Sequence, residues 1–204
     1  MHQINAGARI TATMSPENPS NVLHQATRAT PGIPKSTLDD PELIEELIDL
    51  GANINQRDKE GRTSLYQAVL NRLTGAAVVL IRHYADPTIR CNAGRIPLYW
   101  AMYDGDNYLY EDLYEDLFDA KPSSINERDE TGKTPLHWAV ECGNYGAIEF
   151  LLDWRANVFA RDLKGKRPVD LVPAAYNGVG GADKAEAIKV KLWVAMEEQE
   201  IEED

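Results

Sequence analysis

The sequence predicts a solenoid of stacked repeats, and the first observation behind this fold class is a recurring glycine. Gly61, Gly94, Gly132 and Gly165 are separated by 33, 38 and 33 residues. Around them the chain reads DKEGRTSLYQAV, CNAGRIPLYWAM, DETGKTPLHWAV and DLKGKRPVDLVP, so residue types recur at fixed offsets from each glycine. Self-similarity with a period of about 20 to 50 residues is typical of repeat architectures.

The second observation is another motif that stays in phase with the glycines. It reads LIDLGANIN at 47–55, LIRHYADPT at 80–88 and LLDWRANVF at 151–159. In each copy the alanine lies nine residues before the next turn glycine. Two independent motifs in one register make chance agreement remote.

The stretch DETGKTPLHWA, Asp129 to Ala139, resembles the ankyrin-repeat family, because it matches the pattern D-x-x-G-x-T-P-L-H-x-A at every specified position. The resemblance implies an all-α solenoid of helix-turn-helix units with protruding β-hairpin-like turns. We expect a single ankyrin-repeat domain after an N-terminal extension at 1–15, with an acidic tail at 197–204. The five expected repeats span 16–57, 58–90, 91–128, 129–161 and 162–204.

The first, third and last repeats depart from the pattern. The first carries an insertion, ATPGIPKST at 29–37, whose composition predicts a loop. The third has five extra residues within 107–124, where the YEDLYEDL duplication predicts an amphipathic outer helix over a stripe of Leu109, Leu113, Leu117 and Phe118. The last ends in a predicted helix from Lys184 to about Glu198, whose packed side we expect to hold Ala187, Ile188, Leu192, Trp193 and Val194.

Motif chemistry explains how each unit begins. A turn glycine permits backbone angles that a side chain would penalise, and Thr134 followed by Pro135 supplies an N-cap and a preset first helical residue. The resemblance implies that His137 makes hydrogen bonds within and between repeats, and Tyr66 and Tyr99 at the equivalent place support a structural role. We expect Trp100 and Trp138, one residue further on, to pack between repeats.

Composition narrows the class of protein and the compartment. A net charge of −12 argues against generic nucleic-acid binding, because affinity for a polyanion comes from clustered Lys and Arg. Cys91 and Cys142 are too few for a disulfide framework, which favours a reducing compartment. No stretch approaches 18 apolar residues, so no membrane segment is expected. We expect a soluble, monomeric cytoplasmic protein, with the nucleus as the alternative location.

The resemblance also implies where a partner binds, since ankyrin proteins usually use a concave groove made by the turn tips and the first helices. Ten of the 21 basic residues fall at predicted tips, which indicates an acidic segment of another protein as the partner. Exposed positions collecting charge, or a phosphate-bearing ligand, are the alternatives. The candidate contact residues are Arg57, Lys59, Arg62, Leu70, Asn71, Arg90, Arg95, Tyr103, Asp104, Lys133, Glu141, Arg161 and Lys164.

Other classes of function have less support in the sequence. No nucleotide-binding glycine loop, nucleophile elbow or zinc-helix motif is present, so we expect no enzyme, no cofactor and no metal. The resemblance makes Asn55 a candidate for asparaginyl hydroxylation, with Leu47 eight residues before it. A regulatory module within a larger assembly is the remaining alternative.

Overall fold

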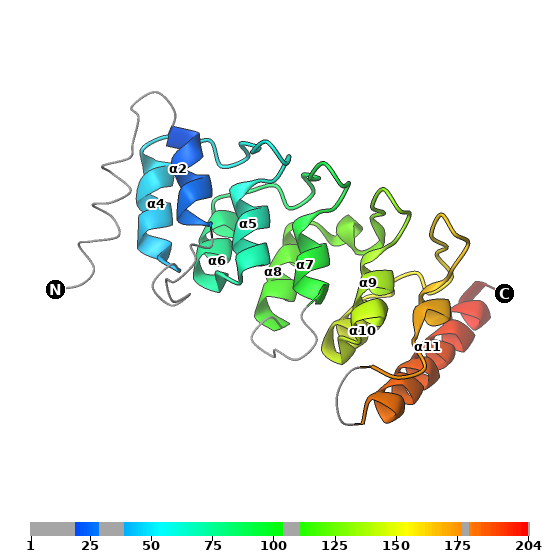
Figure 1. Ribbon diagram of the computed structural model, residues 1–204. Coiled ribbons are helices and arrows are strands. Elements are labelled where there is room, and N and C mark those ends of the chain that lie inside the picture. Colours follow the sequence, from blue (N-terminus) through cyan, green and yellow to red (C-terminus); the bar gives the residue numbers. More distant parts are fainter. Residues whose placement is uncertain (1–18, 29–38, 104–110, 177–179, 204) are drawn as a thin grey trace. The chain divides into compact units, whose positions relative to one another are not determined.

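A computed structural model describes residues 19–28, 39–103, 111–176 and 180–203 (Figure 1). All the regular elements of these residues are helical, which confirms the all-α prediction. The predicted insertion at 29–37, the N-terminal extension at 1–15, and Leu109 lie outside the described residues. The chain divides into two compact units, Met1–Asn92 and Ala93–Asp204, and each is described by itself.

The first unit contains two helix pairs. Helix α2 (Pro19–Ala26) packs on α4 (Pro41–Asp49), and α5 (Ser64–Asn71) packs on α6 (Thr74–Arg82). Contacts of α2 with α5 and of α4 with α6 stack the pairs in register. The core consists of side chains that are at most 1% exposed, among them Leu23, Ile44, Leu65 and Leu80.

The second unit contains three further repeats. They comprise α7 (Pro97–Tyr103) with α8 (Glu111–Ala120) and the short helix η2 (Pro122–Asn126), then α9 (Pro135–Cys142) with α10 (Tyr145–Asp153), then η3 (Pro168–Leu171) with α11 (Gly181–Glu203). Inner helix α9 lies between α7 and η3, and α10 contacts α8. Leu98, Met102, Leu136, Ile148 and Leu192 are buried in this core.

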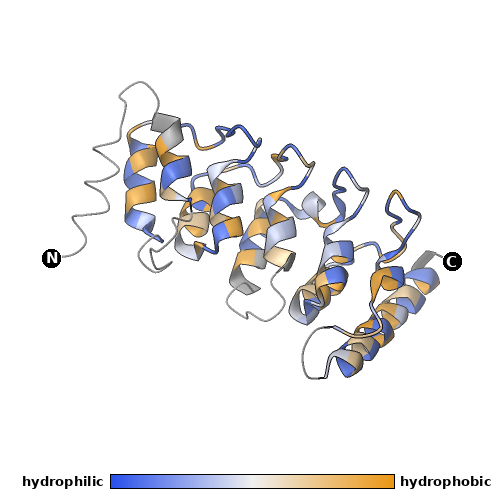
Figure 2. Ribbon diagram, viewed as in Figure 1, coloured by the Kyte–Doolittle hydropathy of each residue, from blue (hydrophilic) through white to orange (hydrophobic). Residues whose placement is uncertain are grey.

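An aspartate organises the turn that precedes each regular inner helix. Oδ1 of Asp129 accepts hydrogen bonds from the backbone N–H groups of Thr131 (2.8 Å) and Lys133 (3.0 Å). Asp58 and Asp162 bond the equivalent N–H groups of their own turns. The backbone N–H of each aspartate donates to the carbonyl four residues later, which closes a hairpin-like turn. These turns are mostly hydrophilic, whereas the helices carry the hydrophobic positions (Figure 2).

The inner helices begin and end where the motif predicts. Thr63 caps α5, its hydroxyl accepting a hydrogen bond from the N–H of Tyr66 (3.2 Å), and Thr134 precedes α9. Helix α9 ends at Gly143 with φ +69°. At the equivalent end of α5 the chain places Arg72 with φ +62°, in the left-handed region that favours glycine.

The last helix differs from the prediction. Helix α11 extends from Gly181 to Glu203, so residues 197–203 continue a helix instead of forming a separate tail. The buried side of α11 consists of Ala185, Ile188, Leu192 and Ala195. Ala187, Trp193 and Val194, which we expected on the packed side, are exposed. In repeat three the described part of the predicted stripe, Leu113, Leu117 and Phe118, is buried as expected.

Candidate functional site

The third residue of each inner helix links one repeat to the turn of the next. Nε2 of His24 lies 2.9 Å from the carbonyl oxygen of Arg62, and Nε2 of His137 lies 3.0 Å from that of Lys166. The hydroxyl of Tyr99 lies 2.9 Å from the carbonyl of Lys133 and 2.7 Å from that of Glu127. Histidine and tyrosine therefore perform the same structural task, as the sequence indicated, and these side chains are buried.

Most tip arginines hold their own turns together. Nε of Arg57 and of Arg128 donates to the carbonyl of the turn glycine four residues later, at 3.1 and 3.0 Å. Nη1 of Arg161 makes the same contact at 2.9 Å. Arg57 also donates to the carbonyl of Arg90 in the next turn (3.0 Å). These guanidinium groups, offered by the sequence as partner contacts, have a local structural role that the spacing alone did not reveal.

Two other predicted contacts form ion pairs inside the chain. Arg62 lies 3.2 Å from Asp58 and 2.9 Å from Glu60. Nζ of Lys133 lies 2.6 Å from Glu141, a second predicted contact residue. An ion pair of this kind lowers the net charge that either residue presents to a partner.

The remaining predicted contacts differ in exposure. Lys59, Arg161 and Lys164 are exposed at turn tips, and Arg90 is half-buried. Leu70 is half-buried on α5, and Nδ2 of Asn71 donates to the carbonyl of Thr27 (2.8 Å), an inter-repeat link. The side chain of Tyr103 and the whole of Asp104 lie outside the described residues.

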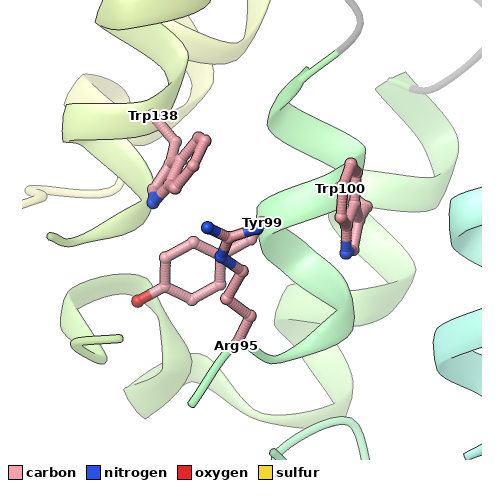
Figure 3. A pocket seen from close by; sticks show the side chains of 4 residues that line it. All are labelled: Arg95, Tyr99, Trp100 and Trp138. Atoms are coloured by element: carbon pink, nitrogen blue, oxygen red, sulfur yellow. The ribbon is translucent and has the colours of Figure 1, made fainter. Parts of the chain in front are cut away.

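Arg95 stands apart from the other tip cations, because aromatic rings surround it in the second unit. Arg95, Tyr99, Trp100 and Trp138 line a small hollow (Figure 3). The guanidinium carbon lies 4.4 Å from the ring centroid of Trp138 and 6.0 Å from that of Trp100. The two tryptophans, expected to pack between repeats, are half-buried and face this hollow, so the expectation of a buried role was wrong.

The hydrogen bonding of Arg95 is incomplete. Its Nε atom is buried and has no hydrogen-bond acceptor among the described residues. The carboxylate of Asp129 is 3.7 Å away, beyond hydrogen-bond distance. That carboxylate is already occupied by the turn and by the indole Nε1 of Trp138 (3.1 Å). A buried donor without an acceptor is costly, and the guanidinium can relieve that cost by accepting a carboxylate from a partner.

The hydroxylation candidate also has a structural contact. Oδ1 of Asn55 accepts a hydrogen bond from the backbone N–H of Asp86 (2.9 Å), and Asn126 makes the equivalent bond to Asn157 (2.8 Å). Both side chains therefore link the ends of consecutive repeats. The modification of Asn55 stays a prediction.

Two searches bear on other classes of protein. Within the part of the chain that the structure describes, no group of three or more His, Cys, Asp or Glu could hold a metal ion. None of the described helices is long and apolar enough to cross a membrane.

Comparison with known proteins points to one family. Residues 89–162 match the family model described as "Ankyrin repeats (3 copies)". The neurogenic locus notch homolog protein 1 of Cricetulus griseus is 30% identical over a segment that covers 65% of this chain and 6% of that protein. The Xenopus tropicalis protein of the same name is 34% identical, over 64% of this chain and 5% of its own length. Rabankyrin-5 of Mus musculus is 29% identical, over 59% of this chain and 10% of its length.

The chain therefore spans at most a tenth of the length of these relatives. The matched family model covers the turn and both helices of repeat four, where Asp129, Thr134 and His137 make the contacts described above. Ankyrin repeats imply a module for protein–protein interaction and are typically non-catalytic. The motif register, the stacked helix pairs and the family match agree that the chain is an ankyrin-repeat protein.

Proposed function

We propose that the chain binds an acidic segment of another protein through the inner-helix side of its second unit, and that Arg95 receives a carboxylate of that segment. The observation that carries this proposal is the buried Nε of Arg95, which has no acceptor among the described residues. Its side chain is 27% exposed, so a partner can reach the guanidinium. An arginine hydrogen bond to a carboxylate is charge-assisted and takes a planar, bidentate geometry.

The aromatic side chains around Arg95 favour a peptide over a simple anion. Trp138 stacks against the guanidinium and fixes its plane, and Trp100 leaves part of its ring accessible beside it. Tryptophan and arginine are the residue types that most often dominate binding energy at protein interfaces. An acidic residue followed or preceded by an apolar one would use both the cation and the rings.

Neighbouring groups modulate the charge at this position. Lys133 lies 5.0 Å from the Trp138 ring centroid but is paired with Glu141. An incoming carboxylate would therefore compete with Glu141 for Lys133, whereas no such competitor holds the Nε of Arg95. We infer that Arg95 contributes more to partner affinity than Lys133 does.

The proposal is tested by selecting random 15-residue peptides that bind the intact chain from a display library. The expected result is enrichment of Asp and Glu beside apolar residues, with Kd values that rise about tenfold or more in Arg95→Gln, in line with the net value of about 1.5–3 kcal/mol for a charged hydrogen bond. Lys121→Gln is the matched control, since it removes one exposed cation of the same unit outside the hollow. Equal Kd values for Arg95→Gln and the parent chain, or enrichment of basic peptides by Arg95-dependent binding, would refute the proposal.

A further inference from the structure

The outward side of α11 carries an apolar stripe. We define the α11 stripe as Val190, Trp193, Val194 and Ile201, which are 49%, 53%, 50% and 76% exposed. Their spacing of three, four and eleven residues from Val190 places them on one side of the helix. The opposite side packs on the repeat core through Ile188 and Leu192, which are fully buried.

A terminal helix with apolar residues on both sides is unusual. The end of a repeat array needs a polar outer face for solubility, and a helix that is apolar all round is normally covered all round. In Figure 2 hydrophobic and hydrophilic residues alternate along the whole of α11. A large exposed side chain such as Trp193 beside two exposed valines is the composition of a docking surface and not of a solvated cap.

The charges around the stripe have one sign. Asp183, Glu186, Glu197 and Glu198 are exposed on the outward half of the helix. The lysines of α11 are turned toward the packed half, where Lys191 pairs with Glu149 of α10 and Lys184 lies 6.0 Å from the ring centroid of Tyr176. The apolar stripe is therefore bordered by carboxylates at both ends.

We propose that the α11 stripe binds a basic amphipathic helix of another protein. The stripe runs from Val190 to Ile201, about 16 Å at 1.5 Å per residue, which three turns of a partner helix would cover. Apolar residues of that helix at i, i+3, i+4 and i+7 would pack on Trp193 and Val194, and flanking Lys or Arg would face Glu197 and Glu198. This proposal does not rest on the Arg95 hollow.

A second copy of the chain fits this surface poorly. Two α11 stripes packed antiparallel would bring Asp183 and Glu186 of one copy against Glu197 and Glu198 of the other. Packed parallel, each carboxylate would face its own counterpart. Both arrangements place like charges together, which disfavours association, so charge complementarity selects a basic occupant.

The experiment uses the full chain and two labelled probes, measured by fluorescence anisotropy. Both are acetylated, amidated 14-residue helical peptides with Leu at the apolar positions, and the polar positions hold Lys in one and Glu in the other. We expect the Leu/Lys peptide to bind and the Leu/Glu peptide to bind at least tenfold more weakly. Binding of the Leu/Lys peptide should weaken at least tenfold in Trp193→Gln and lose much of its salt dependence in Glu197→Gln/Glu198→Gln.

Matched variants separate this site from general attraction between a basic peptide and an acidic protein. Glu45→Gln/Glu46→Gln removes two adjacent exposed glutamates of α4, and Leu163→Gln removes an exposed leucine at a turn tip; both should bind like the parent chain. Arg95→Gln should also leave this binding unchanged. Equal loss in Glu45→Gln/Glu46→Gln and Glu197→Gln/Glu198→Gln would overturn the proposal. So would equal binding of the two peptides, or a parent dimer in sedimentation that Trp193→Gln dissociates.

Discussion

The imidazole of His137 donates from Nε2 to the carbonyl oxygen of Lys166 at 3.0 Å, and this bond joins repeat four to the turn of repeat five. Nδ1 of the same ring lies 3.1 Å from the backbone N–H of Thr134 and must accept that hydrogen bond. Only the neutral ring with its proton on Nε2 satisfies both partners, because a proton on Nδ1 would face an N–H donor. Burial lowers the pKa of His137 below its ordinary value, although the Lys166 carbonyl and Asp162 partly oppose that shift.

This geometry predicts a stability loss in weak acid. Because the folded chain holds the proton less tightly than the unfolded chain, the contribution of His137 is constant above pH 6.5, the ordinary value. Below it the free energy of unfolding falls with decreasing pH, until the pH has passed through the lowered folded value. Urea denaturation at pH 7.5 and 5.5 should show this decrease, and His137→Tyr, which copies Tyr99, should show a smaller one. An equal decrease in both proteins would contradict the assignment.

Two turn glycines with almost the same backbone angle should respond differently to alanine. Gly132 (φ +78°) has the backbone N of Leu163 2.8 Å from the position a Cβ would occupy, whereas Gly165 (φ +76°) has nothing within 4 Å. Gly165→Ala should therefore cost only the left-handed strain, about 1–2 kcal/mol. Gly132→Ala should cost about 1–3 kcal/mol more, because the turns of repeats four and five must also separate. Equal unfolding free energies for the two variants would show that turn-to-turn packing is unimportant.

Tyr84 is a position where a substitution should stabilise the chain. It adopts φ +63° at the end of α6, where Gly51 occupies the equivalent place in the preceding repeat with φ +87°. Its side chain is 90% exposed, so little packing is lost on truncation. Tyr84→Gly should raise the free energy of unfolding by about 0.5–1 kcal/mol, as relief of strain exceeds the entropy cost of glycine. Tyr84→Ala keeps the Cβ and should show no such gain in the same thermal or urea titration.

Cys142 should be a poor nucleophile in the folded chain. Burial raises the pKa of its thiol to about 11, and the carboxylate of Glu141 adds to the shift. Alkylation by iodoacetamide at pH 8 should be about a hundredfold slower than in urea-unfolded protein, since only the thiolate reacts. Cys142→Ser serves as the control, because it leaves only the buried Cys91 to react. Rapid labelling of folded parent chain at Cys142, located by peptide mass, would contradict this expectation.

The repeat architecture could be predicted from the sequence because each turn is built by nearby residues. Asp129 and Gly132 form their turn through contacts no more than four residues apart, and Thr134 starts the helix that follows. A motif at fixed spacing contains all the groups that such local bonds need. The same reasoning assigned His137 and Tyr99 a structural role.

The candidate site could be predicted only in part. Arg57, Arg95 and Arg161 look alike as tip cations in the sequence. Arg57 and Arg161 bond their turn glycines, whereas Arg95 lies against a tryptophan 43 residues later in the chain. Which carbonyl or ring a long side chain meets depends on contacts between repeats, and no single motif encodes them.

By itself the sequence determined the period, the turns, the helix starts and the family, because these depend on backbone angles and on hydrogen bonds between residues a few positions apart. The tertiary structure alone decided that Trp138 faces a hollow beside Arg95 and that Trp193 points outward from α11. The physical reason is that exposure of an apolar side chain is set by what the neighbouring repeats cover, and burial is a property of the assembled stack.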